Sequence, residues 1–362
     1  MRIVSVLEDQ KIEKRISITP EIAKKYIALG FELSLSENYG QHLGFTDNEY
    51  KELGVKFSID EKEIINSADI IVQVGLLSDN KISLIKKNQT LIGALNPYNN
   101  KNKIDTLSKK NANVFSLELL PRITRAQSMD ILSSQANLAG YKAVIDSFAN
   151  FKKAIPMMMT AAGTIPPAKV LVVGAGVAGL QAIATAKRMG AIVFATDVRM
   201  TSKEQVESLG GKFLMVEGSE NLETESGYAK EASDEFKKKQ EELLSETLKK
   251  IDIVICTALI PGKKAPVIIK DSMIAKMQIG SIIYDLAAIQ GGNTALTEVD
   301  KIIDKNGVKI MGETNILNKL PTSASNLYAK NVFNFVSNLY DKESKKININ
   351  LEDEIIEKTL IK

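Results

Sequence analysis

The sequence has few residues of the kinds that carry out nucleophilic or proton-transfer chemistry. Among its 362 residues there is one histidine, His42, one cysteine, Cys256, and no tryptophan. A single cysteine excludes a disulfide within the chain and indicates a reducing, cytoplasmic compartment. We expect no metal site, and we expect Cys256 to be a buried small apolar residue rather than a nucleophile.

Long apolar runs are also missing. The N-terminal stretch "MRIVSVLEDQKIEKR" places charges within its first ten residues, so it is not a signal peptide. The most apolar segment, 170–186, is interrupted by glycines and is shorter than the ~20 residues that a bilayer-spanning helix needs. We therefore predict no transmembrane helix, and a protein of this kind would reach a membrane by docking onto a partner that spans it.

Neither sign of charge is in excess. There are 47 Lys and Arg residues against 44 Asp and Glu residues, interspersed along the chain, and the net charge is +3. Nucleic-acid binding would require basic residues clustered on one face, so it is not expected. The hydrophobic content of 44% is that of a soluble globular protein. The length favours two domains, because single cores stop growing near ~250 residues.

Strands and helices alternate in the first ~120 residues. The segment 19–30 predicts a helix with Thr19 as its N-cap, Pro20 at its first position and Gly30 as its stop. A second helix is expected at 46–54, with Thr46 as its cap. Strands are expected at 2–8, 31–37, 68–75, 89–95 and 114–121. This alternation predicts a parallel sheet covered by helices on both faces.

The middle of the sequence is predicted to join two α/β blocks. A polar loop from residue 121 leads into a long helix ending near residue 151, with Ser128 as a candidate cap, and 155–169 is predicted to be a loop. The second block follows from 170 to about 320, with later strands at 251–260, 280–288 and 308–312. An amphipathic helix at 323–342 is expected to pack back on the first domain. The polar stretch 218–250 is interpreted as an exposed loop followed by a charged helix.

The segment "VLVVGAGVAGLQAIATAKRMGAIVFATDVR" (170–199) has the form of a dinucleotide-binding unit. An apolar strand precedes Gly174, Gly176 and Gly179, a helix follows them, and Asp197 ends the next strand. Gly174 permits the tight turn, Gly176 lets a pyrophosphate approach the backbone, and Gly179 lets helix and strand pack closely. The helix N-terminus offers free N–H groups to the phosphates. Asp197 favours NAD over NADP by bonding the ribose, although Arg199 nearby weakens this preference.

The acid/base residues of an ordinary substrate dehydrogenase are not apparent. Such enzymes move a proton with the hydride and need a group with a pKa near 7, most often His or Lys. The only histidine, His42, lies in a predicted surface loop before a helix, where a solvated or capping role is favoured. Hydride transfer between two nicotinamides needs only the positioning of the rings and the exclusion of water. A lysine base remains an open alternative.

Five motifs resemble the NAD(H)-binding component of the proton-translocating nicotinamide nucleotide transhydrogenases. They are "PRITRAQSMDILSSQANLAGYKAVIDSF", "IPMMMTAAGTIPPAKVLVVGAGVAGLQAIATAKRMGA", "GYAKE", "DLAAIQGGN" and "LPTSASNLYAKN". The resemblance extends over nearly the whole chain. It implies that Arg122, Gln127 and Asp130 lie beside the nicotinamide. Gln127 would contact the nicotinamide ribose and align the ring, while Arg122 and Asp130 would hold the loop.

The resemblance also implies a mobile loop that closes over the nucleotide, with Tyr228 of "GYAKE" as its anchor. Together with the ends of the later strands, it completes the predicted set of nucleotide contacts. This set is Gly174, Gly176, Val177, Gly179, Asp197, Val198, Arg199, Gly227, Tyr228, Gln240, Thr257, Ala258, Leu259 and Asp285.

Alanine dehydrogenases are the nearest relatives of that family and the main alternative. They carry a catalytic Lys and His at the ends of first-domain strands, where the nearest residues here are Gln73 and Asn96. Arg15 matches the region of their substrate-binding arginine, and without those partners it is expected to be a structural charge. An alanine dehydrogenase-like enzyme and a non-catalytic NAD-sensing module both remain alternatives.

The resemblance implies an α/β fold of two Rossmann-like doubly wound domains with an NAD-binding interdomain cleft. The first domain would comprise 1–135 and 322–362, and the second 136–321. It further implies a homodimer and a Re/Si-specific, proton-translocating NAD(P)+ transhydrogenase. The partners would be separate NADP(H)-binding and membrane-spanning subunits. The chain would attach peripherally to the cytoplasmic face of the inner membrane.

Overall fold

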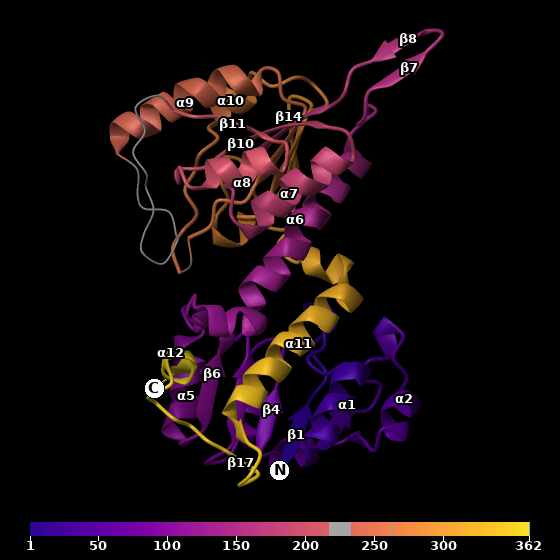
Figure 1. Cartoon of the computed structure of the whole chain (residues 1–362), viewed down its shortest axis with the longest axis vertical. Coiled ribbons are helices and arrows are strands. Elements are labelled where there is room, and N and C mark those ends of the chain that lie inside the picture. Colours follow the sequence, from indigo (N-terminus) through magenta and orange to yellow (C-terminus); the bar gives the residue numbers. More distant parts are fainter. Residues whose placement is uncertain (217–232, 261, 362) are drawn as a thin grey trace. The chain divides into compact units, whose positions relative to one another are not determined.

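In this computed structural model we describe residues 1–216, 233–260 and 262–361. The chain forms two compact units (Figure 1). Unit 1 comprises Met1–Gln135 and Leu317–Lys362, and unit 2 comprises Ala136–Ile316. The first boundary falls within helix α6 (Ile131–Asn150), so one continuous helix contributes residues to both units. Each unit contains a seven-stranded sheet with helices, which confirms the predicted α/β class.

The sheet of unit 1 is doubly wound. From edge to edge its strands are β18 (Leu360–Ile361), β6 (Asn113–Ser116), β5 (Thr90–Gly93), β4 (Ile70–Val72), β1 (Arg2–Ser5), β2 (Glu32–Ser36) and β3 (Lys56–Ser58). All pairs are parallel except β18 with β6. The strand expected at 2–8 is present as β1 and ends at Ser5. Ile3, Val4, Ser5 and Val6 are all buried, because a central parallel strand is covered on both faces.

The helices of unit 1 begin where the sequence provides starting signals. Helix α1 starts at Pro20 after Thr19, and Gly30 beyond its end has a φ of +90°. Thr46 forms a capping box with Glu49 at the start of α2, which confirms the predicted cap. The helices are α1 (Pro20–Ala28), α2 (Asp47–Glu52), α3 (Glu61–Asn66), α4 (Asp79–Leu84), α5 (Lys101–Lys109), α11 (Pro321–Leu339) and α12 (Glu354–Thr359), with 3-10 turns η1 (Gln41–Leu43), η2 (Leu117–Leu119), η3 (Thr124–Met129) and η5 (Ile316–Lys319).

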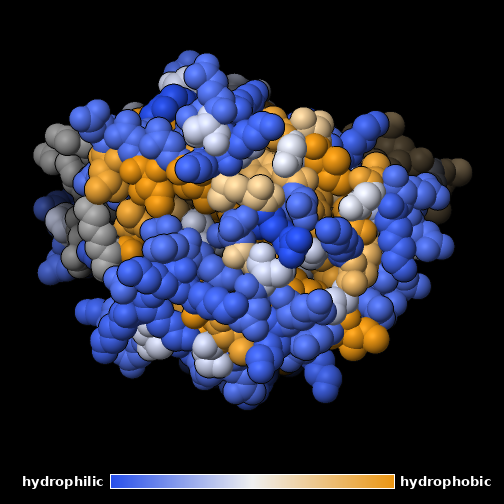
Figure 2. All heavy atoms as spheres, turned by 90° about the horizontal axis from the view of Figure 1, so that it is seen from below, coloured by the Kyte–Doolittle hydropathy of each residue, from blue (hydrophilic) through white to orange (hydrophobic). Residues whose placement is uncertain are grey.

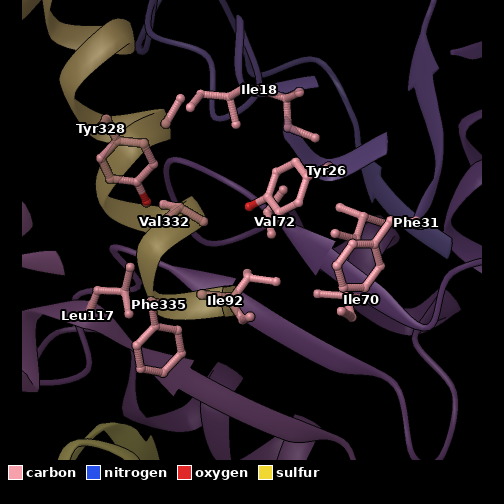
Figure 3. Close-up of a cluster of buried hydrophobic side chains, with 14 of the residues drawn as sticks. Ile18, Tyr26, Phe31, Ile70, Val72, Ile92, Leu117, Tyr328, Val332 and Phe335 are labelled. Carbon is pink, nitrogen blue, oxygen red and sulfur yellow. The ribbon is translucent and has the colours of Figure 1, made fainter. Parts of the chain in front are cut away.

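The core of unit 1 joins the two ends of the sequence. Figure 3 shows Tyr328, Val332 and Phe335 of α11 in one cluster with Val72 of β4 and Ile92 of β5. All five side chains are fully buried. Burial of a large apolar side chain contributes about 1.5–3 kcal/mol. Helix α11 is therefore part of the unit 1 core, although it follows all of unit 2 in the sequence.

The sheet of unit 2 has the strand order of a Rossmann fold. From edge to edge its strands are β11 (Lys212–Phe213), β10 (Ile192–Thr196), β9 (Lys169–Val173), β12 (Ile253–Cys256), β13 (Ile282–Asp285), β15 (Val308–Met311) and β14 (Ile302–Lys305). Only β14 is antiparallel. Its helices besides α6 are α7 (Val177–Arg188), α8 (Ser202–Ser208), α9 (Asp234–Leu248) and α10 (Asp271–Ile274), with the 3-10 turn η4 (Ala288–Gln290). The strand order reverses between β9 and β12, which marks the expected ligand edge.

Two expectations from the sequence are wrong. Segment 155–169 was predicted to be a loop, but it contains the hairpin β7 (Met158–Thr160) and β8 (Gly163–Ile165). Every residue of these two strands is exposed, so the segment lacks the buried positions that indicate a strand in a sequence. The strand predicted at 114–121 ends at Ser116 and is followed by η2.

One face of the molecule carries many polar residues. Figure 2 shows hydrophilic residues over much of one face of the molecule, with hydrophobic residues in patches between them. Across residues 1–216, 233–260 and 262–361, no helix is both long and apolar enough to cross a lipid bilayer. Two short strands, β16 (Tyr340–Asp341) and β17 (Lys346–Ile347), form a separate antiparallel pair after α11.

Candidate functional site

The glycine turn lies between β9 and α7, at the point where the strand order of unit 2 reverses. Gly174 has a φ of +94°, which disfavours residues with a β-carbon. A β-carbon at Gly179 would lie 1.9 Å from the carbonyl oxygen of Gly174. By contrast, apart from its chain neighbours, no described atom lies within 4 Å of the position a β-carbon at Gly176 would take. Packing thus requires Gly174 and Gly179, while the space beside Gly176 is open to a ligand.

Helix α7 begins directly after this turn. Its N-cap is Gly176, which has no side chain to bond the first N–H groups, and Val177 at its first position is 41% exposed. These N–H groups and the positive end of the helix dipole favour an anion. The N-terminus of α7 is therefore suited to a phosphate.

Asp197 lies just beyond the end of β10 and is held in place by two groups. Its Oδ2 accepts a hydrogen bond of 2.7 Å from the backbone N–H of Ala175, within the glycine turn. The side chain of Arg199 forms a two-pronged ion pair with the same carboxylate, with both contacts at 2.9 Å. Val198 between them is partly buried. The carboxylate predicted to bind the ribose is thus fixed against the turn, and Arg199 partly neutralises its charge.

Thr257 follows β12 on the other side of the reversal point. Its Oγ1 donates to the carbonyl oxygen of Gly174 at 2.8 Å, which joins the two strand ends. Leu259 nearby is 39% exposed. Cys256, the last residue of β12, is completely buried, and burial raises the pKa of its thiol well above the ordinary value. This confirms the prediction of a buried apolar cysteine.

Asp285 is the last residue of β13, the strand next to β12. It is completely buried, and its oxygens accept hydrogen bonds from Ala287, Asn293, Thr294 and Thr297. Burial raises the pKa of Asp285, although these hydrogen bonds lower it. The carboxyl therefore organises the loop that follows β13.

The loop after β13 is held by a residue that the sequence reasoning missed. The amide of Asn293 accepts from the N–H of Ala258 and donates to the carbonyl of Ala258, at 3.0 and 2.9 Å. It thereby fixes the two peptide groups on either side of Ala258, a predicted nucleotide contact. Asn293 ends the motif "DLAAIQGGN", and this position was the available signal.

In unit 1, the predicted nicotinamide loop is the 3-10 turn η3 (Thr124–Met129). Ala126 and Met129 are buried and anchor the turn, whereas Gln127 between them and Arg122 before it are exposed. Asp130 accepts from both the N–H and the hydroxyl of Ser133, so it caps α6. Ser128, the candidate cap, does not have this role, because it lies farther from the first helical residue, Ile131.

A partly buried carboxyl group was also missed. Oε1 of Glu8, just beyond the end of β1, accepts hydrogen bonds from the N–H groups of Val74 and Gly75 and from Nε2 of Gln73, at 3.0–3.2 Å. Burial raises the pKa of Glu8 to about 7, despite the lowering effect of the backbone bonds. This carboxyl group of unit 1 therefore titrates near neutrality. In the sequence, Glu8 follows closely on the apolar strand β1, and this position could have indicated a carboxyl group near the sheet.

The residues compared with the alanine dehydrogenase site are engaged by protein groups. Arg15 pairs with both oxygens of Glu13 at 2.8 and 2.7 Å and donates to Gln135 at 2.8 Å. Oε1 of Gln73 accepts from the hydroxyl of Ser5 at 2.7 Å. The N–H of Asn96 donates to the carboxylate of Glu118 at 3.0 Å. The guanidinium of Arg15 is thus bonded by protein side chains, as expected for a charge with a structural role.

His42 is exposed, as expected for a solvated residue, and it lies within η1 rather than at the start of a helix, so the alternative capping role is wrong. Its Nε2 lies 2.8 Å from the carbonyl oxygen of Lys14, and its Nδ1 lies 3.1 Å from Nε2 of Gln10. The ring thus links η1 to the loop that follows β1.

Some of the predicted site residues cannot be placed. Gly227, Tyr228 and the rest of the "GYAKE" motif lie outside the described residues. Gln240 lies in α9 and is partly buried. Within the described ranges, no group of three or more His, Cys, Asp or Glu side chains is arranged to hold a metal ion.

Comparisons with known proteins give a consistent result. Residues 6–139 match the family described as alanine dehydrogenase/PNT, N-terminal domain, and residues 143–362 match its C-terminal domain. The chain is 48% identical to a Rhodospirillum rubrum protein that is named as the first part of NAD(P) transhydrogenase subunit alpha, over 100% of this chain and 96% of that protein.

Solved structures agree with these sequence matches. A transhydrogenase structure from Sinorhizobium meliloti is similar with a TM-score of 0.88 and 42% identity, covering 99% of this chain and 97% of that one. An L-alanine dehydrogenase structure has a TM-score of 0.83 at 19% identity, covering 99% and 94%, and so shares the fold.

Proposed function

We propose that this chain is the NAD(H)-binding component of a proton-translocating transhydrogenase. The chain belongs to the alanine dehydrogenase/PNT family, and it is related over its whole length to an NAD(P) transhydrogenase alpha subunit. The family relationship implies a nicotinamide nucleotide. The observation that carries the proposal is the glycine turn at the reversal point of the unit 2 sheet, with open space beside Gly176 and Asp197 fixed nearby.

The residues of unit 2 have distinct roles in binding. The N-terminus of α7 and the backbone at Gly176 hold the pyrophosphate. The carboxylate of Asp197 accepts hydrogen bonds from the hydroxyls of the adenosine ribose. The negative charge of Asp197 disfavours a 2′-phosphate, which supports NAD(H) rather than NADP(H). Thr257, Ala258 and Leu259 contact the nicotinamide half, with Ala258 held by Asn293. When bound, the nucleotide supplies the hydride.

The exposed residue Gln127 contacts the nicotinamide ribose and aligns the ring with NADP+ on a partner subunit. Asp130 fixes the end of the loop by capping α6, and Arg122 shapes its beginning. The chain needs to contribute alignment and the exclusion of water, because no proton leaves the reacting carbons. In the complete complex, this transfer is coupled to proton translocation by membrane-spanning subunits at the cytoplasmic face of the inner membrane.

A homodimer is included in the proposal. The β7–β8 hairpin exposes Met157, Met158, Met159 and Ile165, with Met159 at 77%. Apolar side chains concentrated on one projecting hairpin support contact with a second copy of the chain.

The test is to mix the purified chain with the NADP(H)-binding domain of a transhydrogenase and to follow reduction of an NAD+ analogue by NADPH. We expect rapid transfer in the mixture and none with either protein alone. Oxidation of L-alanine by the chain alone, without transfer in the mixture, would instead establish an amino-acid dehydrogenase. Nucleotide binding without either reaction would establish an NAD-sensing module.

A substitution tests the alignment role. Gln127→Asn shortens the side chain by one methylene and moves its amide away from the ribose. We expect the transfer rate to fall at least about tenfold while the Kd for NADH changes less than about twofold. Stopped-flow measurement of transfer and fluorescence titration of NADH separate the two effects. Proportional losses of rate and affinity would contradict an alignment role.

A further inference from the structure

We propose that three asparagines of α11, Asn331, Asn334 and Asn338, are positioning residues that hold the loop carrying Gln127. The functional side of this inference rests on the proposed function, because it assigns Gln127 to alignment of the nicotinamide. The three asparagines are spaced by three and four residues. They therefore lie along one side of the helix.

Two of the asparagines bond the same carbonyl group. Nδ2 of Asn331 and Nδ2 of Asn334 each donate to the carbonyl oxygen of Ser128 at 2.9 Å. Ser128 directly follows Gln127 within η3. A carbonyl oxygen has two lone pairs, and here each is used by one asparagine. The peptide that joins Ser128 to Met129, one residue beyond Gln127, is thus fixed in orientation by α11.

The third asparagine acts through an ion pair on the other side of Gln127. Nδ2 of Asn338 donates to Oδ2 of Asp353 at 3.2 Å. The carboxylate of Asp353 pairs with the guanidinium of Arg125, whose Nη1 lies 3.0 Å from Oδ2. Asp353 also caps α12 by accepting from the N–H of Ile355. Gln127 therefore lies between two residues, Arg125 and Ser128, that are both linked to the face of α11.

The direction of the Asn331 amide is set by a second contact. Its Oδ1 accepts a hydrogen bond of 2.7 Å from the hydroxyl of Ser134 in α6, which leaves Nδ2 to face Ser128. Asn331 is only 8% exposed. Asparagine is a poor helix former, and the presence of Asn331 and Asn334 within α11 and of Asn338 in its last turn is explained by these contacts outside the helix.

We call these contacts of Asn331, Asn334 and Asn338 with the loop the asparagine clamp. Its loss should affect hydride transfer and nucleotide affinity differently. Gln127 is exposed, and only its neighbours Ala126 and Met129 are anchored in the core. Loss of the bonds to Ser128 would let the exposed peptide rotate and move the amide of Gln127. The glycine turn, Asp197 and Thr257 belong to unit 2, so they remain unchanged. Ring alignment should therefore deteriorate while nucleotide affinity is retained.

The experiment compares Asn334→Ala and the double variant Asn331→Ala/Asn334→Ala with wild type. The control is Asn326→Ala, which changes an exposed asparagine of the same helix. We expect transfer from NADPH to the NAD+ analogue to slow about threefold in the single variant and at least about tenfold in the double variant, since each hydrogen bond is a modest term. The Kd for NADH should stay within about twofold of wild type.

A second measurement is independent of activity. Limited trypsin digestion followed by mass spectrometry reports cleavage after Arg122 and Arg125, at the start of the loop and within the turn. We expect cleavage at these two sites to accelerate in both variants and to be unchanged in the control. If wild type does not transfer hydride, the proposed function fails, while the digestion still tests the clamp. Wild-type rates of transfer and cleavage in both variants, or equal losses of rate and affinity, would overturn the inference.

If the double variant does not fold, Asn334→Ala decides the question. Asn334 is only partly buried, so this truncation leaves no large cavity. A threefold slower transfer with unchanged NADH affinity supports the clamp, and wild-type behaviour overturns it.

Discussion

In the proposed function, the ion pair between Asp197 and Arg199 sets which nucleotide unit 2 prefers. The carboxylate is bound by a guanidinium and by the backbone of the glycine turn. As long as this pair is intact, Arg199 is directed toward Asp197 and away from a 2′-phosphate. We therefore expect discrimination between the two coenzymes to be a property of the pair and not of the carboxylate alone.

We expect Asp197→Asn to weaken NADH binding about tenfold and to reduce the preference for NADH over NADPH by a similar factor. The substitution removes the charge that bonds the ribose and releases Arg199 to bind a phosphate. Fluorescence titrations with both reduced coenzymes measure the two Kd values. An unchanged ratio of the two Kd values would refute this explanation of specificity.

A second residue-scale prediction concerns Glu8. Because burial raises its pKa from 4.5 to about 7, the folded state keeps a proton that the unfolded chain loses. Stability of unit 1 should be highest below pH 4.5 as far as Glu8 is concerned. It should fall as the pH rises to 7, by at most about 3 kcal/mol. The neighbouring Glu13 raises this pKa and Lys81 lowers it, but neither changes the sign.

Glu8→Gln tests this dependence, because the amide oxygen can still accept the three hydrogen bonds without a charge. Opening free energies of β1 and β4 amides, measured by hydrogen exchange at pH 5 and pH 8, should differ less in the variant than in wild type. Glu52→Gln, at an exposed position, is the control. The same pH dependence in wild type and Glu8→Gln would show that another group is responsible.

At the scale of elements, the turn between β9 and α7 separates packing from binding. Gly179→Ala should destabilise unit 2 by several kcal/mol, because its β-carbon would lie 1.9 Å from the carbonyl oxygen of Gly174. Gly176→Ala should leave the melting temperature nearly unchanged and weaken NADH binding at least about tenfold, because its methyl group enters the open space beside the turn. Calorimetry and NADH titration distinguish the two effects. A large loss of stability in Gly176→Ala would contradict this division.

The elements with buried apolar runs or capping signals could be predicted from the sequence. Strand β9, the turn and α7 follow from glycines at fixed spacing after an apolar run, and the start of α2 follows from Thr46 and Glu49. The β7–β8 hairpin was missed because all its strand residues are exposed, which removes the usual alternation. Its strands are defined by hydrogen bonds between backbones, and these leave little trace in side-chain pattern.

The geometry of the candidate site was predictable only where a single segment contains it. The glycine turn and Asp197 lie within one stretch of 30 residues, so their spacing was sufficient. Contacts between distant segments could not be derived from the sequence. The bonds from Asn331 and Asn334 to Ser128 join residues about 200 positions apart, and the raised pKa of Glu8 depends on burial by neighbouring strands. The placement of Arg122, Gln127 and Asp130 in the site came from family resemblance.

At the scale of the whole molecule, the exposed hairpin predicts how copies associate. We expect Met159→Glu to shift the chain from dimer to monomer, because it places a charge on the most exposed apolar residue of the hairpin. Sedimentation measured over a range of concentrations reports the change. Ile59→Glu, at an 80% exposed position in unit 1, is the control. A dimer of unchanged stability in Met159→Glu would assign the interface elsewhere.

The place of α11 in the core of unit 1 has a consequence for synthesis on the ribosome. Tyr328, Val332 and Phe335 belong to a hydrophobic cluster in which most of the other members, from Ile3 to Ile131, are synthesised before unit 2. The core of unit 1 is therefore incomplete, and part of its apolar strand surface stays exposed, until unit 2 has been translated. We infer that unit 2 becomes protease-resistant first and that chains stalled before residue 321 need chaperones. Proteolysis of stalled nascent chains would reveal this order of folding.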